Sequence, residues 1–220
     1  MKIALFTAGQ PRFTQSLAIL QDQLKGYSEA HIYLVLWPSD DYKSSQDVID
    51  KTSKLLLPNV TYKYIEIRKK EPNWFDDSKY PIRQNRKLIP SNLFKMWYGL
   101  NETFLKIPNE YDAYVRFRLD GRLSCDYDLK THNLDQGLVM PRKPRYGYGL
   151  TPVNDQFAIA NYDNMKKYCS IIHEIDRYYA TSGFPFHQEN YLSYHLTVDN
   201  KVNILDGAFT SVIKTDPGLI

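Results

Sequence analysis

The chain has 220 residues, of which 43% are hydrophobic and 24% charged, which is typical of a globular protein that buries a substantial core in one domain. Its net charge of +3 is too small to indicate nucleic-acid binding by itself, so we expect no nucleic-acid partner. It contains no apolar run of about 18 residues, which argues against a membrane span, and its two cysteines lack CxxC spacing, which argues against a disulfide framework and structural zinc.

The first 67 residues alternate between predicted strands and predicted helices. Largely apolar segments that end at turn residues predict strands over residues 2–8, 31–37 and 61–67. Apolar residues at helical spacing predict helices from Phe13 to a stop at Gly26, and over residues 47–57. Strands that alternate with helices through short connections are typical of a parallel α/β sheet.

The order is less regular in the rest of the chain. Residues 69–90 are polar and rich in proline, and an irregular segment of this length is usually functional or mobile. Ser91 is a candidate N-cap for a helix whose apolar stripe is Phe94, Trp97, Leu100 and Phe104. Further strands are predicted over residues 111–123, 137–140, 156–160 and 202–205, and further helices over residues 164–179 and 188–196.

The predicted strand over residues 111–123 has the most informative pattern. With a two-residue period, one face carries Tyr111, Ala113, Val115, Phe117 and Leu119, and the other carries Tyr114, Arg116, Arg118, Asp120 and Arg122. One interpretation is a half-solvated sheet face with charges that compensate each other. The other is a carboxylate at the end of a strand, in a cationic cleft. In that case Asp120 is the best metal ligand, with Asp126 and Asp128 as substitutes, because hard cations prefer carboxylate oxygens.

The first half of the chain contains three candidate sites for phosphate or nucleoside. The turn from Thr7 through Ala8 and Gly9 to Arg12 follows the first strand, where open α/β sheets bind ligands, but it is neither GxGxxG nor a Walker loop. Asp40 follows the second strand and could accept hydrogen bonds from a base or ribose. Arg86 and Lys87 belong to a basic cluster that could clamp a diphosphate. A plain surface turn or a solvated loop is the alternative at each place.

The second half offers acidic candidates. Asp155 lies between two amides before a predicted strand, where it could bind sugar hydroxyls or act as a base. Glu189 lies in the first turn of a predicted helix, a position that the helix dipole favours regardless of function. With His187 it could form a metal ligand and general base.

Five segments together resemble a known family. In order they read MKIALFTAGQPRF, SNLFKMWYGLNE, YDAYVRFRLDG, NDQFAIANYDNMKKY and HQENYLSYHL. This order resembles small GT-A glycosyltransferases, most of all those of bacterial surface-polysaccharide loci and of large viruses, including enzymes that glycosylate capsid proteins. The similarity covers nearly the whole chain, although each motif is short.

The resemblance implies a single GT-A-like (Rossmann-like) α/β domain over residues 1–220, with a mixed, mostly parallel central sheet flanked by helices. Residues 1–123 would bind the nucleotide-sugar and residues 124–220 the acceptor. The implied donor is a UDP- or GDP-sugar, and the implied acceptor is a glycan or glycoprotein. The two cysteines without a disulfide framework favour a reducing compartment, so we expect a cytoplasmic location, which for a viral protein would be the host cytoplasm. No oligomeric state is implied.

The resemblance also implies roles for particular residues. Thr7, Ala8, Gly9, Arg12 and Asp40 would surround the nucleoside, Arg86, Lys87, Arg118 and Arg122 would face phosphate, and Asp155 or Glu189 would be catalytic. A Mn²⁺ or Mg²⁺ ion would be held by Asp120, with His187. The family's Asp-x-Asp motif is incomplete here, because Arg122 stands where the second acid would lie, and an arginine can replace part of a cation's charge.

Two other functions remain open from the sequence. A sugar-phosphate nucleotidyltransferase should carry a Gly-rich phosphate loop near its N-terminus, which AGQPR matches poorly. A non-catalytic carbohydrate-binding protein would account for the 18 tyrosines and for the incomplete Asp-x-Asp motif.

Overall fold

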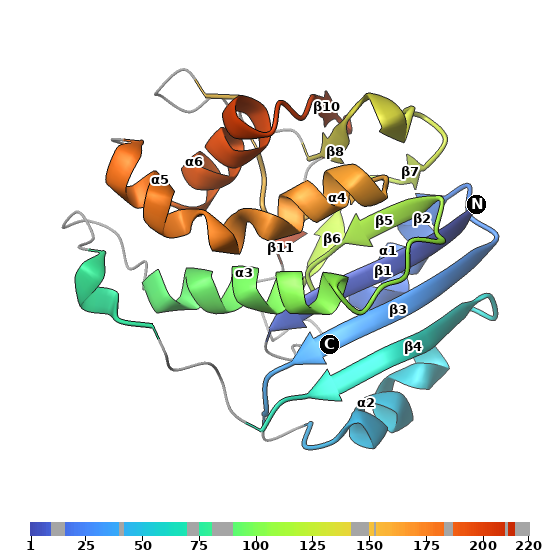
Figure 1. The fold of residues 1–220 in the computed structure, drawn as a ribbon. Helices are drawn as coiled ribbons and strands as arrows, with labels where there is room; N and C mark the ends of the chain where they lie inside the picture. Colours follow the sequence, from blue (N-terminus) through green and yellow to red (C-terminus); the bar gives the residue numbers. More distant parts are fainter. Residues whose placement is uncertain are drawn as a thin grey trace.

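A seven-stranded sheet forms the centre of the protein (Figure 1). The computed structural model describes residues 1–9, 16–39, 42–69, 75–80, 90–141, 150–151, 153–182, 187–209 and 211–213. From one edge of the sheet to the other, the strands are β4 (Val60–Ile67), β3 (Glu29–Leu36), β1 (Lys2–Gly9), β5 (Ala113–Arg116), β9 (Ala158–Ala160), β8 (Leu138–Met140) and β10 (Ile204–Asp206).

The sheet is mixed but mostly parallel, which confirms the predicted fold class. Only β9 runs antiparallel to its neighbours, β5 and β8. From β1 the chain first builds β3 and β4 on one side and later returns to place β5 on the other. In open α/β sheets, the crevice at such a reversal of strand order, beyond the carboxyl ends of the strands, is where ligands bind.

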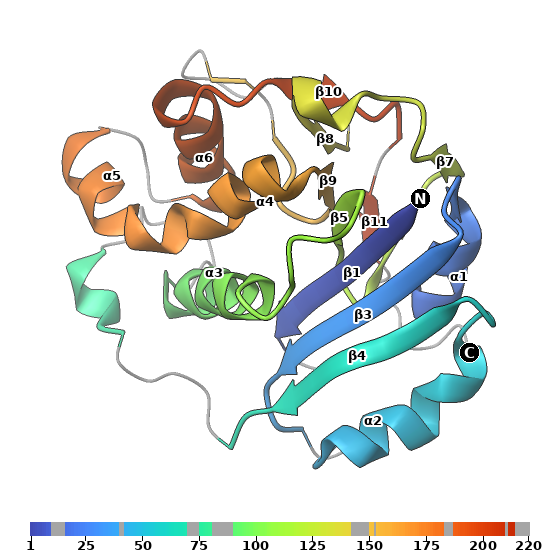
Figure 2. The ribbon, with the colours of Figure 1, turned by 45° about the vertical axis from the view of Figure 1, so that its right-hand side comes forward.

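Helices cover both faces of the sheet, as Figure 2 shows. One face carries α1 (Ser16–Gln23) and α2 (Ser45–Thr52). The other carries α3 (Pro90–Phe104), α4 (Tyr162–Cys169), α5 (Ile175–Thr181) and α6 (Gln188–Ser193). Because both faces are covered, the parallel strands read as continuous apolar runs: Ile3 and Leu5 of β1 pack under α1, and Ala4 and Phe6 pack on the opposite face.

Short elements complete the described parts of the chain. Two small ladders pair β2 with β7 and β6 with β11, and the remaining elements are single helical turns. Their bounds are β2 (Leu24–Lys25), β6 (Gly121–Leu123), β7 (Tyr127–Asp128), β11 (Ser211–Ile213), and turns at Ser53–Leu55, Asp77–Lys79, Leu134–Gln136, Ser170–His173 and Tyr194–Asp199. None of the helices described is long and apolar enough to cross a membrane.

The strand over residues 111–123 is shorter than predicted. β5 ends at Arg116, and after a turn the chain continues as β6, which is not part of the main sheet. The two-residue alternation is confirmed from Ala113 to Leu119. The half-solvated face is wrong within β5, because Tyr114 is fully buried and Arg116 is only 2% exposed, whereas Arg118 and Asp120 after it are partly exposed and pair with each other. Tyr111 precedes the strand and packs beside Tyr114 instead.

The helix predicted over residues 164–179 is interrupted. The carbonyl of Lys167 accepts hydrogen bonds from the Ser170 hydroxyl at 2.9 Å and from Nε2 of His195 at 2.7 Å. A continuing α-helix would use that carbonyl for the next turn. The chain therefore forms α4, a 3₁₀ turn and α5. The later helix, predicted over residues 188–196, begins as expected and continues to Asp199 as a π-helical turn.

Helix α3 begins at Pro90, so Ser91 lies inside the helix and is not its N-cap. Instead, the backbone N–H and the hydroxyl of Ser91 both donate to the Asp77 carboxylate, at 2.7 and 3.0 Å. The predicted apolar stripe is confirmed, since its four residues are all buried. At Gly99 the helix lies against β1 so closely that a Cβ would stand 2.8 Å from Cβ of Ala8.

Candidate functional site

A pocket of about 370 Å³ opens at the carboxyl ends of β1 and β5. It therefore lies at the reversal of strand order between β1 and β5, the expected ligand position in such a sheet. Its walls come from β1, from β5 and the turn after it, and from the first half of α3, with single side chains from the ends of β3, β9 and α6.

The β1 wall consists of Thr7, Ala8 and Gly9. Gly9 has φ +125°, a conformation that L side chains rarely adopt, while a Cβ there would meet nothing within 4 Å. Glycine is thus required by the backbone and not by a lack of space. The Gly9 carbonyl accepts a 2.9 Å hydrogen bond from the N–H of Trp37, a further residue of the pocket wall, which ties the ends of β1 and β3 together.

An arginine and an acid face each other in the turn after β5. Arg118 donates from Nε and Nη2 to the two carboxylate oxygens of Asp120, both at 2.9 Å. This is the bidentate geometry that matches a planar guanidinium to a carboxylate. The hydrogen bond to Asp120 raises the pKa of Arg118 above its ordinary value, against the effect of burial. Asp120 therefore fixes the orientation of Arg118 at the pocket.

The last residue of β5, Arg116, is buried at the base of the pocket. Only 2% of it is exposed, and its Nε and Nη1 atoms have no hydrogen-bond partner among the described residues. Its Nη2 atom makes one weak contact, with Sδ of Met96 at 3.9 Å.

Asp155 reaches the pocket because β9 is antiparallel. The residues before β9 lie at the same edge of the sheet as the residues after β1 and β5. Asp155 is 3% exposed, and its backbone carbonyl accepts a hydrogen bond from the Tyr168 hydroxyl at 3.3 Å. Nearby, Gln188 at the start of α6 lines the pocket, and its Oε1 atom is buried without a hydrogen-bond partner in the described parts of the chain.

The structure brings together six of the predicted site residues. They line one pocket although they come from three separate segments: Thr7, Ala8, Gly9, Arg118, Asp120 and Asp155. The predicted residues Arg12, Asp40, Arg86 and Lys87 lie outside the described residues.

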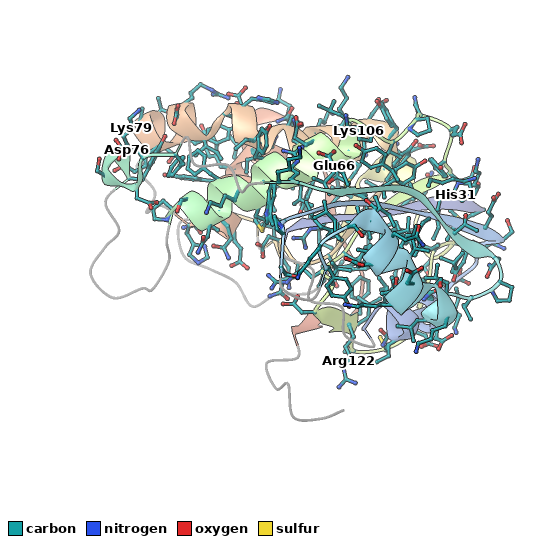
Figure 3. All side chains as sticks on the ribbon, turned by 90° about the horizontal axis from the view of Figure 1, so that it is seen from below. His31, Glu66, Asp76, Lys79, Lys106 and Arg122 are labelled. Carbon is teal, nitrogen blue, oxygen red and sulfur yellow. The ribbon has the colours of Figure 1, made fainter. Side chains whose placement is uncertain are left out.

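Three other predicted residues do not line this pocket. Arg122 is exposed on β6, and its side chain projects outward from the protein (Figure 3). His187 is the N-cap of α6, where its ring accepts from the N–H of Glu189 at 3.4 Å. Glu189 is the third of these residues, and its Oε2 atom is 4.0 Å from Nδ1 of His187. Gln188, which lies between the two in the sequence, lines the pocket instead.

Several pocket residues were not among the sequence predictions. The most important is Arg116: the sequence pattern places it on the polar face of the strand but does not indicate that it is buried. Lys95 and Asn92 come from the face of α3 opposite its apolar stripe, a pattern that normally marks a solvated surface. No pattern in the sequence indicates that three further lining residues belong to a site: Trp37, Met96 and Gln188.

The acids of the pocket do not fit a metal ion held by protein ligands alone. Both oxygens of Asp120 are engaged by Arg118. Within the described ranges, no three or more His, Cys, Asp or Glu side chains are grouped so that they could hold a metal ion. Hard cations in proteins normally take several oxygen ligands from protein, phosphate and water.

For any reaction that this pocket catalyses, we expect Asp120→Ala to lower turnover by up to about 100-fold, because a misplaced binding group can cost that much. Without the carboxylate, Arg118 is no longer held by two parallel hydrogen bonds. The fold should persist, since Asp120 lies in a turn outside the main sheet. Steady-state kinetics with circular dichroism would test this, with the same substitution at exposed Asp126 as the control. Normal turnover in Asp120→Ala would reject the positioning role.

Comparison with known proteins adds no assignment. Neither a scan against models of protein families nor a search of curated proteins found a match to this chain.

Proposed function

We propose that the protein is a glycosyltransferase that moves a sugar from a nucleoside-diphosphate sugar, UDP- or GDP-linked, to a hydroxyl of a glycan or glycoprotein. The observation that carries the proposal is the pocket at the strand-order reversal, which combines a glycine turn, two arginines and two acids. Its volume of about 370 Å³ lies within the ordinary range for small-ligand sites. The sequence resemblance to GT-A glycosyltransferases supports the same function.

In this proposal the diphosphate of the donor lies near Arg116 and Arg118, beside the open backbone at Gly9. The absence of a Cβ at Gly9 permits close approach of the ligand to the backbone. Trp37, at the end of β3, forms part of the wall on the side where the nucleoside would lie.

Asp155 is the better placed of the two predicted catalytic acids, because it lines the pocket and Glu189 does not. In the proposed reaction, the acceptor oxygen attacks the anomeric carbon and its proton passes to the Asp155 carboxylate. The bond from the anomeric carbon to the diphosphate oxygen breaks, and its electron pair stays on the phosphate. The guanidinium groups stabilise the charge that develops there.

The cysteines support a reducing compartment such as the cytoplasm. Cys125 is exposed and Cys169 buried, and both are free thiols. Burial raises the pKa of the Cys169 thiol well above its ordinary value, which makes it unreactive.

The experiment that tests the proposal is a donor screen. We expect UDP or GDP to bind with a micromolar dissociation constant in calorimetry, and the matching nucleotide-sugar to be hydrolysed slowly without any acceptor. Water replaces the acceptor in this assay, so the natural acceptor need not be known. Measuring released sugar and nucleoside diphosphate in equal amounts would support a glycosyltransferase.

Two outcomes would contradict the proposal. Release of pyrophosphate from a nucleoside triphosphate and a sugar 1-phosphate would identify a nucleotidyltransferase. Binding of free glycans without any binding of nucleotide would identify a carbohydrate-binding protein.

A further inference from the structure

The Arg116 guanidinium is a buried cation for which the described residues supply no hydrogen-bonded anion. It is 2% exposed, its Nε and Nη1 have no hydrogen-bond partner in the described parts of the chain, and Nη2 meets only the Met96 sulfur at 3.9 Å. Taking an ion out of water costs several kcal/mol unless the ion is paired and hydrogen-bonded. A fold that retains such a group indicates that the partner is supplied by a ligand.

The position of Arg116 limits where that ligand lies. In the sheet it pairs with Phe6 of β1 and with Ala158 of β9, so it is central and cannot move into solvent. Its side chain is on the face covered by α3 and α4, within the range of electrostatic interaction with Tyr168 and Cys169. The open side is the pocket, which Arg116 lines.

The charge of the pocket favours an anion. Its lining contains three cationic side chains, Lys95, Arg116 and Arg118, and two acidic ones, Asp120 and Asp155. The charges of Arg118 and Asp120 compensate each other, because the two side chains are joined by two hydrogen bonds. The planar fork of Arg116 matches the oxygens of a phosphate.

A second unpaired group points to the rest of the ligand. The Oε1 atom of Gln188 lines the same pocket, buried and without a described partner. A carbonyl oxygen can only accept, so its partner must donate, as a hydroxyl does. Among the described residues, no anion is hydrogen-bonded to Arg116 and no donor to Oε1 of Gln188, and a phosphorylated sugar would supply both.

We propose that Arg116 is the anchor for a phosphate group, that Gln188 accepts a hydrogen bond from a ligand hydroxyl, and that phosphate binding needs no divalent cation. The identification of this phosphate with the diphosphate of a nucleotide-sugar rests on the proposed function. The anchor itself depends only on the orphaned guanidinium.

The test measures binding of inorganic pyrophosphate and of UDP and GDP by calorimetry, in EDTA and again with Mn²⁺. We compare Arg116→Met, which removes the charge at similar volume, with Arg122→Met, which makes the same change on an exposed residue away from the pocket. Binding in EDTA is expected for the unaltered protein and for Arg122→Met. Arg116→Met should bind roughly 10- to 100-fold more weakly, the worth of a charged hydrogen bond.

Thermal unfolding separates an anchor from a structural arginine. Because replacing an uncompensated buried charge by an apolar side chain relieves its desolvation, Arg116→Met should unfold at the same or a higher temperature. A structural role predicts a lower unfolding temperature for Arg116→Met. In that case Arg116→Lys, which keeps the charge, should recover little of the binding. Under our proposal Arg116→Lys recovers part of the binding.

The outcomes separate this inference from the proposed function. Nucleotide binding that appears only with Mn²⁺, or that survives in Arg116→Met, overturns the anchor and leaves a glycosyltransferase possible. Arg116-dependent binding of pyrophosphate without any binding of UDP or GDP upholds the anchor and overturns the nucleotide-sugar donor.

Discussion

Asp155→Asn is expected to reduce kcat for the nucleotide-sugar by roughly 100- to 10,000-fold, the usual contribution of a general base. The amide has almost the same shape as the carboxylate but cannot take the proton of the attacking hydroxyl or water. KM for the donor should change little, because the substitution affects the transition state more than binding. Donor hydrolysis over a range of donor concentrations measures both constants.

The controls for Asp155→Asn distinguish a base from a general loss of charge. Glu189→Gln makes the equivalent change in a buried acid that does not line the pocket, and Asp126→Asn makes it in an exposed one. We expect a small effect in the first and none in the second. If Glu189→Gln abolished turnover and Asp155→Asn did not, the roles of the two acids would have to be exchanged.

Gly137→Ala is expected to cause the largest loss of stability of the substitutions considered. A Cβ at Gly137 would lie 2.2 Å from the backbone oxygen of Asn203. That oxygen accepts a 2.9 Å hydrogen bond from the N–H of Leu138, at the point where β8 meets β10. Backbone atoms cannot rotate away as a side chain can, so β10 must separate from β8.

The expected cost of Gly137→Ala is at least about 1–3 kcal/mol, the usual penalty for forcing extra atoms into a packed site. This corresponds to an unfolding temperature lower by roughly 2 to 12 °C. Gly9→Ala is the matched comparison, because a Cβ there has open space and the cost comes only from the positive φ. Equal unfolding temperatures for Gly137→Ala and the unaltered protein, measured by calorimetry, would contradict the steric argument.

The sequence predicted the main sheet well where the hydrophobic pattern is strong. A short apolar run such as residues 31–37 is typical of a strand buried on both faces, and the stripe of α3 has one clear period. The break between α4 and α5 could not be predicted, because it depends on His195, which lies 28 residues after the Lys167 carbonyl that it contacts. The N-terminal anchoring of α3 by Asp77 is likewise a long-range contact.

The candidate site was only partly predictable. Asp120 and Asp155 are predictable because an acid beside a strand end is an informative pattern, and the pocket includes both. The three arginines of RFRLDGR look equivalent in the sequence, but the strand ends at Arg116. As a result Arg116 is buried, Arg118 pairs with Asp120, and Arg122 is exposed. The three arginines differ in environment because the chain leaves the sheet directly after Arg116, and the sequence pattern does not mark that position.

The single reversed strand, β9, also means that the chain runs in opposite directions through the two walls of the pocket. The arginines belong to a segment that leaves the sheet, whereas Asp155 belongs to one that enters it, and 38 residues of chain separate Arg116 from Asp155. Under the function that we propose, changes in the segment that enters β9 would alter which acceptor hydroxyl reaches Asp155, while Arg116 and Arg118 would still bind the phosphate of the donor. Such a protein would acquire new acceptors and keep the same donor.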